Sequence, residues 1–275
     1  PGPGLACSFK ITRSLATARS GTCELVVNNL SREHSHELAS LPRRTTFVRV
    51  DAGYEEGMSR LFTGDLRKGV PSREGATWRV SCTAGDGEHA RRTARISRAF
   101  AAGTATAIAA QALADAMGVG VGNAAAAFRG VRLNGHGESF EDGCVLQGNA
   151  AAALTDLCNS ANLTWSIQDG VIQVLGLGQS TQDTAIRIGA DSGMIDSPTI
   201  VDRRTITVKC LIQPGLRPGA RVVIDSLLGS GEWRVSEVTF NGETEGNAWD
   251  ADLTLKRPRG SLLDRSAPGE TAVDS

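Results

Sequence analysis

The segment TITVKCLI, Thr205–Ile212, alternates polar and apolar residues as far as Cys210 and ends in two apolar residues. Every second side chain from Ile206 onward is apolar, so an extended chain places all of them on one face. The segment WDADLTLK, Trp249–Lys256, repeats the pattern with a tryptophan, an alanine and two leucines on one face. A period of two residues, with glycine- and proline-containing turns between the segments, predicts an antiparallel sheet or barrel.

More strands are predicted on both sides of these two segments. Pro218-Gly219 marks a turn before RVVI, and the apolar phase of WRVSEVTF slips between Val235 and Val238. Such a slip predicts a β-bulge. Near the N-terminus, SGTCELVVNNL, TTFVRVDAGY and TWRVSC are likewise predicted strands. The chain therefore begins and ends in β-structure.

The middle of the chain changes to helical periodicity. Apolar residues at helical spacing predict a helix over 104–117, with Thr104 as its N-cap and Gly118 as the residue that ends it. A second amphipathic helix is predicted over 149–161. The apolar face of the first helix is mostly alanine, so its neighbour must come close.

A hairpin is predicted directly after the second helix, over residues 163–175. Asp169-Gly170 is a dipeptide typical of a two-residue turn between antiparallel strands. Helix and hairpin together form a compact α/β unit. The register that this turn implies pairs Ile167 with Ile172 and Trp165 with Val174.

The predicted fold class is α+β and mainly β, with two antiparallel β-barrel or sandwich domains and a small α/β region between them. The sequence places the first β domain at 1–90 and the α/β region at 91–184. The second β domain follows at 185–257, and an extended C-terminal tail at 258–275. A chain of 275 residues fits about two domains of ordinary size.

Composition excludes several functional classes. The formal net charge is −1, so no global positive field attracts nucleic acid. No segment is apolar for long enough to span a membrane, so stable membrane insertion is not expected. Of the 29 basic residues 25 are arginine, which suits ion pairs at interfaces but would equally follow from a GC-rich genome. Four of the six cysteines fall in apolar periodic runs and are predicted to be buried thiols: Cys23, Cys82, Cys158 and Cys210. A reducing compartment is therefore expected.

Two motifs have residue types typical of ligand sites but lack the surroundings that such sites need. Gly118–Ala125, GVGVGNAA, fits GxGxxA, but a dinucleotide site needs a strand before the glycines, and here a helix precedes them. The run REHSHE is predicted to be the solvated face of a short helix capped by Ser31. Its candidate metal ligands are Glu33, His34, His36 and Glu37. No further ligand follows at a spacing typical of a metal site, so metal binding is not expected.

Two further segments carry residues that could serve binding or catalysis. The segment HARRTARISRAF (89–100) carries four arginines that could contact nucleic acid. If the segment is a strand, Arg92 and Arg98 lie on one face and Arg91 and Arg95 on the other. The aromatic residues that would stack on nucleic-acid bases are lacking, so nucleic-acid binding is not expected. The segment GHGESFEDG (135–143) holds Glu138 and Glu141 near His136, and these two carboxylates could resemble the catalytic pair of a hydrolase. The segment is rich in glycine and polar residues, so it is predicted to be an exposed loop. The sequence therefore predicts no catalytic, cofactor-binding or metal-binding residue, and no enzyme.

Several segments, in this order, resemble the baseplate hub proteins of tailed phages and contractile injection machines. They are SGTCELVVNNLS (20–31), TFVRVDAGYEEGMSRLFTGDL (46–66), ARISRAFAAGT (94–104), IGADSGMIDSPT (188–199) and GEWRVSEVTFNGETEGNAWDADLTL (231–255). The resemblance rests on the order and spacing of all five. It implies that both β domains have the tail-tube fold.

The resemblance also implies a function and partners. Three chains form a ring whose six similar domains match a sixfold tail tube to a threefold central spike. The implied partners are a homotrimer, the tail tube or distal tail protein, the spike or tip protein and the tape measure protein. DNA passes through the channel without sequence-specific binding. The implied location is the baseplate of the virion, after assembly in the host cytoplasm.

Two other functions stay open on the sequence alone. A monomeric binding module of a tail tip, for a glycan or a protein ligand, needs an exposed aromatic cluster. The tryptophans could supply one only if they lay outside, whereas their periodicity places them inside: Trp78, Trp165, Trp233 and Trp249. A cell-wall hydrolase needs a carboxylate pair in a cleft, for which Glu138 is the candidate.

Overall fold

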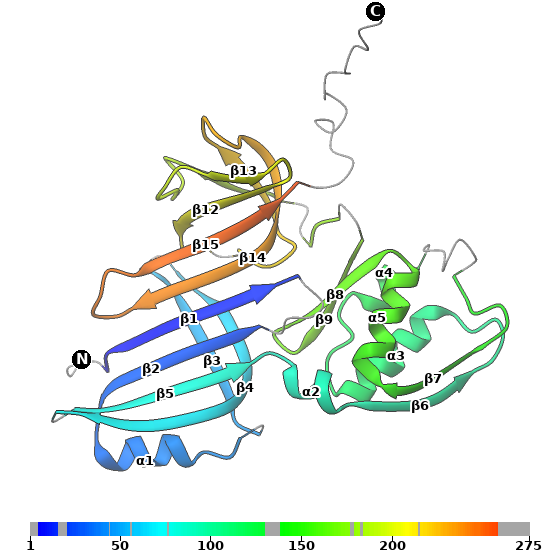
Figure 1. Ribbon diagram of the computed structural model, residues 1–275, viewed down its shortest axis with the longest axis horizontal. Helices are drawn as coiled ribbons and strands as arrows, with labels where there is room; N and C mark the ends of the chain where they lie inside the picture. The colour runs from blue at the N-terminus through cyan, green and yellow to red at the C-terminus, as the bar shows by residue number, and fades with distance from the viewer. Residues whose placement is uncertain are drawn as a thin grey trace, which may run out of the picture.

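The computed structural model describes residues 5–15, 21–43, 45–55, 57–75, 77–129, 138–176, 179–181, 184–213 and 215–257. Strands account for 52% and helices for 18% of the described residues, which confirms the mainly β, antiparallel prediction. The predicted C-terminal tail, 258–275, lies outside the described residues. Figure 1 shows a large sheet on one side and a smaller α/β lobe on the other.

Eleven strands form the large sheet, in the order β11-β12-β15-β14-β1-β2-β5-β4-β3, with β13 pairing to β14 and β10 to β13. The strands are β1 (Cys7–Ser14), β2 (Thr22–Leu30), β3 (Phe47–Tyr54), β4 (Gly57–Glu74), β5 (Thr77–Gly85), β10 (Ile186–Gly189), β11 (Thr199–Asp202), β12 (Thr205–Leu211), β13 (Arg221–Asp225), β14 (Gly231–Glu243) and β15 (Trp249–Lys256).

The first and last parts of the chain meet in the middle of this sheet. Strand β1 pairs antiparallel with β14 on one side and with β2 on the other, so Ile11 lies opposite Phe240 and Cys23. The order is an open path in which β11 and β3 are the ends, so the described strands do not close a barrel through their hydrogen bonds. The predicted division into two β domains remains a proposal.

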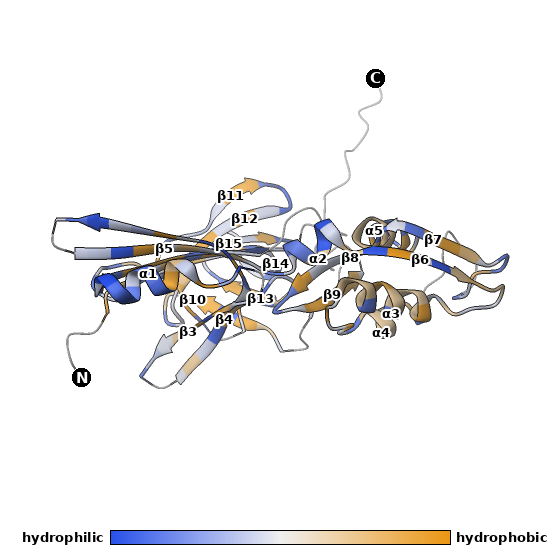
Figure 2. Ribbon diagram, turned by 90° about the horizontal axis from the view of Figure 1, so that it is seen from below, coloured by the Kyte–Doolittle hydropathy of each residue, from blue (hydrophilic) through white to orange (hydrophobic). Residues whose placement is uncertain are grey.

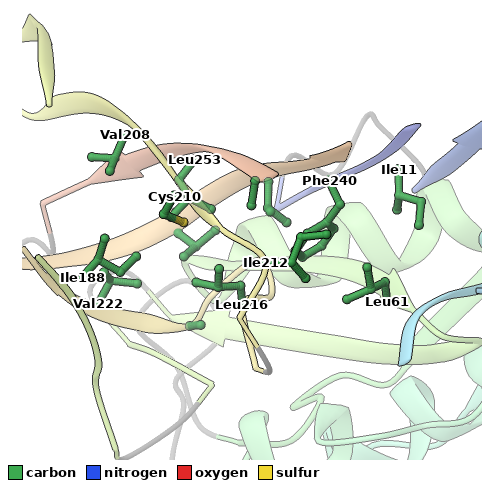
Figure 3. Packing of buried hydrophobic residues seen from close by; sticks show 14 of the residues in the cluster. Ile11, Leu61, Ile188, Val208, Cys210, Ile212, Leu216, Val222, Phe240 and Leu253 are labelled. Carbon is green, nitrogen blue, oxygen red and sulfur yellow. The ribbon is translucent and has the colours of Figure 1, made fainter. Parts of the chain in front are cut away.

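One hydrophobic core serves both parts of the sheet. Ile11 of β1 and Phe62 of β4 are fully buried in the same cluster as Cys210, Val235 and Phe240 from the later strands. Figure 3 shows Ile11 and Leu61 near Phe240, and the aliphatic residues of β10, β12, β13 and β15 around Cys210. The alternation that predicted these strands therefore fills a shared interior.

The α/β lobe has a separate core. Its elements are α2 (Glu88–Thr93), β6 (Arg95–Phe100), α3 (Thr106–Met117), α4 (Ala124–Ala127), β7 (Cys144–Asn149), α5 (Ala150–Ser160), β8 (Leu163–Gln168) and β9 (Val171–Gly176). Fully or nearly fully buried residues of α3, α4, α5 and the β8–β9 hairpin pack together around Leu113, Leu154 and Trp165. The alanine-rich face of α3 allows this close contact between α3 and α5 (Figure 2).

Several local predictions are confirmed and a few are wrong. The bulge lies where β14 shifts register between Val235 and Glu237, and the β8–β9 hairpin has the predicted pairs. Helix α3 begins after Ala105 rather than Thr104, and no side chain caps it. The Thr106 hydroxyl instead donates to the Glu138 carbonyl. Sequence reasoning missed the full length of β4 and the parallel pairing of β10 with β13.

Candidate functional site

A buried charged junction joins the α/β lobe to the large sheet. Arg13 and Asp86 are 2% and 1% exposed, and Arg13 Nη2 lies 3.0 Å from Asp169 Oδ2 and 3.9 Å from Asp86 Oδ2. Arg217 approaches Asp169 from the outside at 3.5 Å. We call these four residues the charged junction. Two arginines and two aspartates balance each other's charge, which ionised groups away from water require.

The β8–β9 turn brings backbone donors to this junction. Asp169 and Gly170 both have positive φ values, 55° and 75°, as a tight turn between antiparallel strands requires. In this conformation both amides point at the Asp86 carboxylate. The Asp169 N–H donates to Oδ2 at 2.5 Å, and the Gly170 N–H donates to Oδ1 at 2.9 Å. The hairpin tip is therefore fixed to the end of β5.

Arg13 ties the same point to the sheet interior. It lies on β1, two residues from Ile11 and two from Leu15, and all three share the buried face. Its Nη1 donates to the carbonyl of Leu61 in β4 at 2.9 Å. One side chain thus contacts β4, the loop after β5 and the β8–β9 turn.

Burial shapes the acid–base behaviour of the junction. Desolvation raises the pKa of Asp86 to about 6, although Arg13 and the two backbone amides favour the ionised form. Asp65, on β4, also has a raised pKa because it is partly buried. Within the charged junction, Asp86 therefore takes up a proton in the mildly acidic range.

The structure separates the residues that the sequence suggested as ligand sites. His34 and His36 lie exposed on α1 (Arg32–Ser40), which Ser31 caps as predicted, accepting from the His34 amide. In the described parts of the chain, no group of three or more His, Cys, Asp or Glu residues is placed to hold a metal ion. None of the helices described there combines the length and hydropathy that crossing a bilayer requires.

The glycine-rich segment after α3 contacts protein rather than presenting a ligand loop. Gly118 ends α3 in the left-handed conformation, as predicted. Gly120 bonds both ways with the hairpin, donating to the Gly170 carbonyl at 2.9 Å and accepting from the Ile172 amide at 2.8 Å. A Cβ on Gly122 would lie 2.0 Å from the Ile172 carbonyl oxygen. Close packing against β9 explains these glycines.

The four arginines do not share one strand, which corrects the predicted faces. Arg91 and Arg92 lie on α2, and only Arg95 and Arg98 lie on β6. The predicted faces hold only for one continuous strand, whereas Glu88–Thr93 forms a short helix before β6 begins. Glu138 and Glu141 lie in the predicted loop before β7, and His136 lies outside the described residues.

Apolar side chains are exposed at the two ends of the sheet. All four residues of the edge strand β11 are exposed, and Val201 is 60% exposed. Figure 2 shows β11 at the margin of the sheet, with apolar residues in orange. Leu227, in the turn between β13 and β14, is fully exposed. At the other end, Phe47 of β3 and Met58 of β4 are 69% and 72% exposed. Exposed apolar groups on an open edge are typical of surfaces that another chain covers.

Comparison with solved structures gives the same fold for nearly the whole chain. The 43 kDa tail protein of prophage MuSo2 from Shewanella oneidensis superposes with a TM-score of 0.60 at 13% identity, covering 93% of both chains. The chain has the fold of a phage tail protein. The tail protein from Neisseria meningitidis MC58 gives a TM-score of 0.60 at 12% identity, over 92% of this chain and 97% of that one.

A third structure extends the fold to secretion machinery. The E. coli c3393 protein, a component of the type VI secretion system with structural similarity to the T4 tail proteins gp27 and gp5, has a TM-score of 0.54. It is 8% identical and is covered over 75% of its length, against 94% of this chain. No family model and no curated protein matches the sequence. The tail-protein resemblance predicted from the sequence is confirmed in the fold.

The charged junction is the feature that sequence reasoning missed. Asp169 was interpreted only as a turn residue. A signal was present in β1, because Arg13 occupies the apolar phase between Ile11 and Leu15. A charge on the buried face of a strand requires a buried partner, but only the tertiary structure identifies that partner.

Proposed function

We propose that this chain is a structural, non-enzymatic protein of a phage-type tail, and that three copies form the baseplate hub. The hub would connect the sixfold tail tube to the threefold spike or tip and surround part of the DNA channel. The observation that carries this proposal is the fold, which matches two tail proteins, one of them from a prophage, over more than nine-tenths of this chain.

The large sheet supports a role in a ring. Its two open ends carry exposed apolar residues, among them Val201 on β11 and Phe47 on β3. In a ring, one end of each subunit meets a different surface of the next, so complementary edges are required. Burial of these side chains between copies would remove them from water and stabilise the assembly.

The tryptophans weaken the alternative of a monomeric binding module. Trp165 and Trp233 are only 1% and 2% exposed, and Trp78 and Trp249 are partly buried. Trp165 donates its indole N–H to the Thr155 hydroxyl at 3.1 Å, inside the lobe. Side chains held in this way do not form an exposed stacking surface for a sugar.

Light scattering on a size-exclusion column, at several protein concentrations, tests the proposal. The expected mass is about 86 kDa, three times the 28.8 kDa of one chain. If the chain alone is a monomer, the neighbouring spike and tube proteins are added on the same column. A monomer that stays monomeric and unbound in the presence of both would contradict the hub.

A further inference from the structure

A polar cavity of about 760 Å³ lies where the sheet meets the α/β lobe, distinct from the charged junction. Residues of β1, β2 and β4 form one side, and α2 with the beginning of α5 forms the other. Figure 1 shows α2 in this position, between the sheet and the helices of the lobe. The cavity is thus built within one chain and does not require a ring.

The cavity has an excess of positive charge. Three arginines line it, Arg67, Arg91 and Arg92, whereas Glu88 is the single carboxylate among the lining residues that the structure describes. Glu88 is shared, since it pairs with Arg67 and lies 3.8 Å from Arg92. The guanidinium groups of Arg67 and Arg92 together carry ten N–H donors. A single carboxylate cannot accept hydrogen bonds from all of them, so some of these donors remain available to a ligand.

Two guanidinium nitrogens of the lining arginines are buried without a partner. Arg67 Nη2 and Arg91 Nη1 are shielded from solvent, and neither has a hydrogen-bond partner among the described residues. Arg91 also lies over the Trp165 ring, 5.0 Å from its centroid, and burial lowers its pKa. A guanidinium with a free, buried N–H is stabilised by a charge-assisted hydrogen bond to an oxyanion.

Helix α5 adds a second source of positive potential. Its first turn lines the cavity through Ala151 and Ala152, and the helix is 11 residues long. Asn149 caps it and also donates to the Arg91 carbonyl at 3.0 Å, which holds α2 beside the helix N-terminus. The N-terminal end of a helix carries a partial positive charge that favours a nearby anion.

We propose that this cavity is an oxyanion site that binds a carboxylate presented by an acidic peptide segment of a partner protein. The volume exceeds what one small anion fills, and the exposed residue Thr22 adds a hydroxyl to the lining that can bond a peptide backbone. No aromatic side chain is among the described lining residues, so nucleic-acid bases find no stacking platform. A formal net charge of −1 also gives DNA no general attraction.

Fluorescence anisotropy with a fluorescein-labelled hexaglutamate peptide, in buffer of low ionic strength, tests the site on the full chain. Arg92→Gln and Arg67→Gln are each expected to weaken binding about tenfold, since each removes charge-assisted hydrogen bonds. Glu88→Gln is expected to tighten binding several-fold, because it frees both arginines. Arg79→Gln is the matched control, because Arg79 of β5 pairs with Glu74 of β4 outside the cavity. This substitution should leave binding unchanged.

Folding is checked by thermal melting of every variant. Arg92 is 77% exposed, so Arg92→Gln remains informative even if Arg67→Gln fails to fold. Failure of hexaglutamate to bind, or equal weakening by Arg79→Gln, would overturn the site. A 12-nucleotide single strand or inorganic phosphate that binds in place of the peptide, with the same arginine dependence, would overturn the assignment of its occupant.

Discussion

Nη2 of Arg13 lies 3.0 Å from Oδ2 of Asp169, although the two residues are 156 positions apart in the chain. Arg13 comes from the centre of the large sheet and Asp169 from the tip of the β8–β9 hairpin. Asp86 completes the contact by accepting both amides of that tip. The orientation of the α/β lobe on the sheet therefore depends on a buried, charge-balanced contact.

Removal of Arg13 should destabilise the whole chain. Arg13→Met keeps the length of the side chain but leaves Asp86 and Asp169 without their buried counter-ion. We expect the free energy of unfolding to fall by about 3–5 kcal/mol, the usual cost of breaking a buried pair on one side. Urea denaturation followed by tryptophan fluorescence measures it.

Arg217→Gln is the matched control for that experiment. Arg217 also approaches Asp169, but its side chain is 45% exposed. Solvent screens this pair, so the loss should stay below about 1 kcal/mol. Equal losses for the two variants would show that burial does not set the strength of the junction.

The stability of the chain should depend on pH through Asp86. Its pKa is about 6 in the folded chain, against 3.8 for the free group, so the folded state binds the proton more tightly. The contribution to stability is therefore full below pH 4 and is lost as the pH rises to 6, by an amount of the order of 3 kcal/mol.

Asp86→Asn isolates this contribution. Urea denaturation between pH 4 and pH 7 should show a smaller fall in stability for the variant than for the parent chain. Asp65 contributes in the same direction in both proteins, so it cancels in the difference. Parallel stability curves for the two proteins would mean that Asp86 does not titrate in this range.

A charge in the shared core should prevent folding. Val235 is fully buried on β14, and Val235→Asp places a carboxylate among apolar residues that cannot solvate it. We expect insoluble protein or loss of the cooperative transition, and Val208→Asp on β12 should behave in the same way. A soluble variant with parental melting behaviour would contradict the strand assignment.

The same charge on the open edge should affect assembly only. Val201 on β11 is mostly exposed, so Val201→Asp should change the free energy of unfolding of one chain by no more than about 0.5 kcal/mol. If β11 is covered in the ring, the mass measured by light scattering should fall from three chains to one. An unchanged trimer would place the subunit contact elsewhere.

The six cysteines should react in two classes. All six are free thiols, and burial raises the pKa of Cys23, Cys158 and Cys210 to about 12. Because the thiolate is the reactive form, these three should resist a disulfide reagent at pH 8. Titration with that reagent should modify at most three thiols rapidly in the native chain and six in guanidinium chloride.

Much of the local structure could be predicted from the sequence because it depends on short-range pattern. The alternation in Thr205–Ile212 fixes which face of β12 is buried, and Asp169-Gly170 specifies a tight turn whatever surrounds it. Arg91 and Arg92 show the limit of this approach. A run too short to show a period does not distinguish strand from helix, and here contact with α5 decides.

The tertiary structure alone decided which distant residues meet. The pairing of β1 with β14 merges the two ends of the chain into one core, and no local signal specifies a partner more than 200 residues away. Arg13 carried a clear signal of a buried charge, but Asp86 and Asp169 had none that linked them to it. Pattern determines which side of a strand faces inward, whereas the packing of elements far apart in the chain determines what lies opposite.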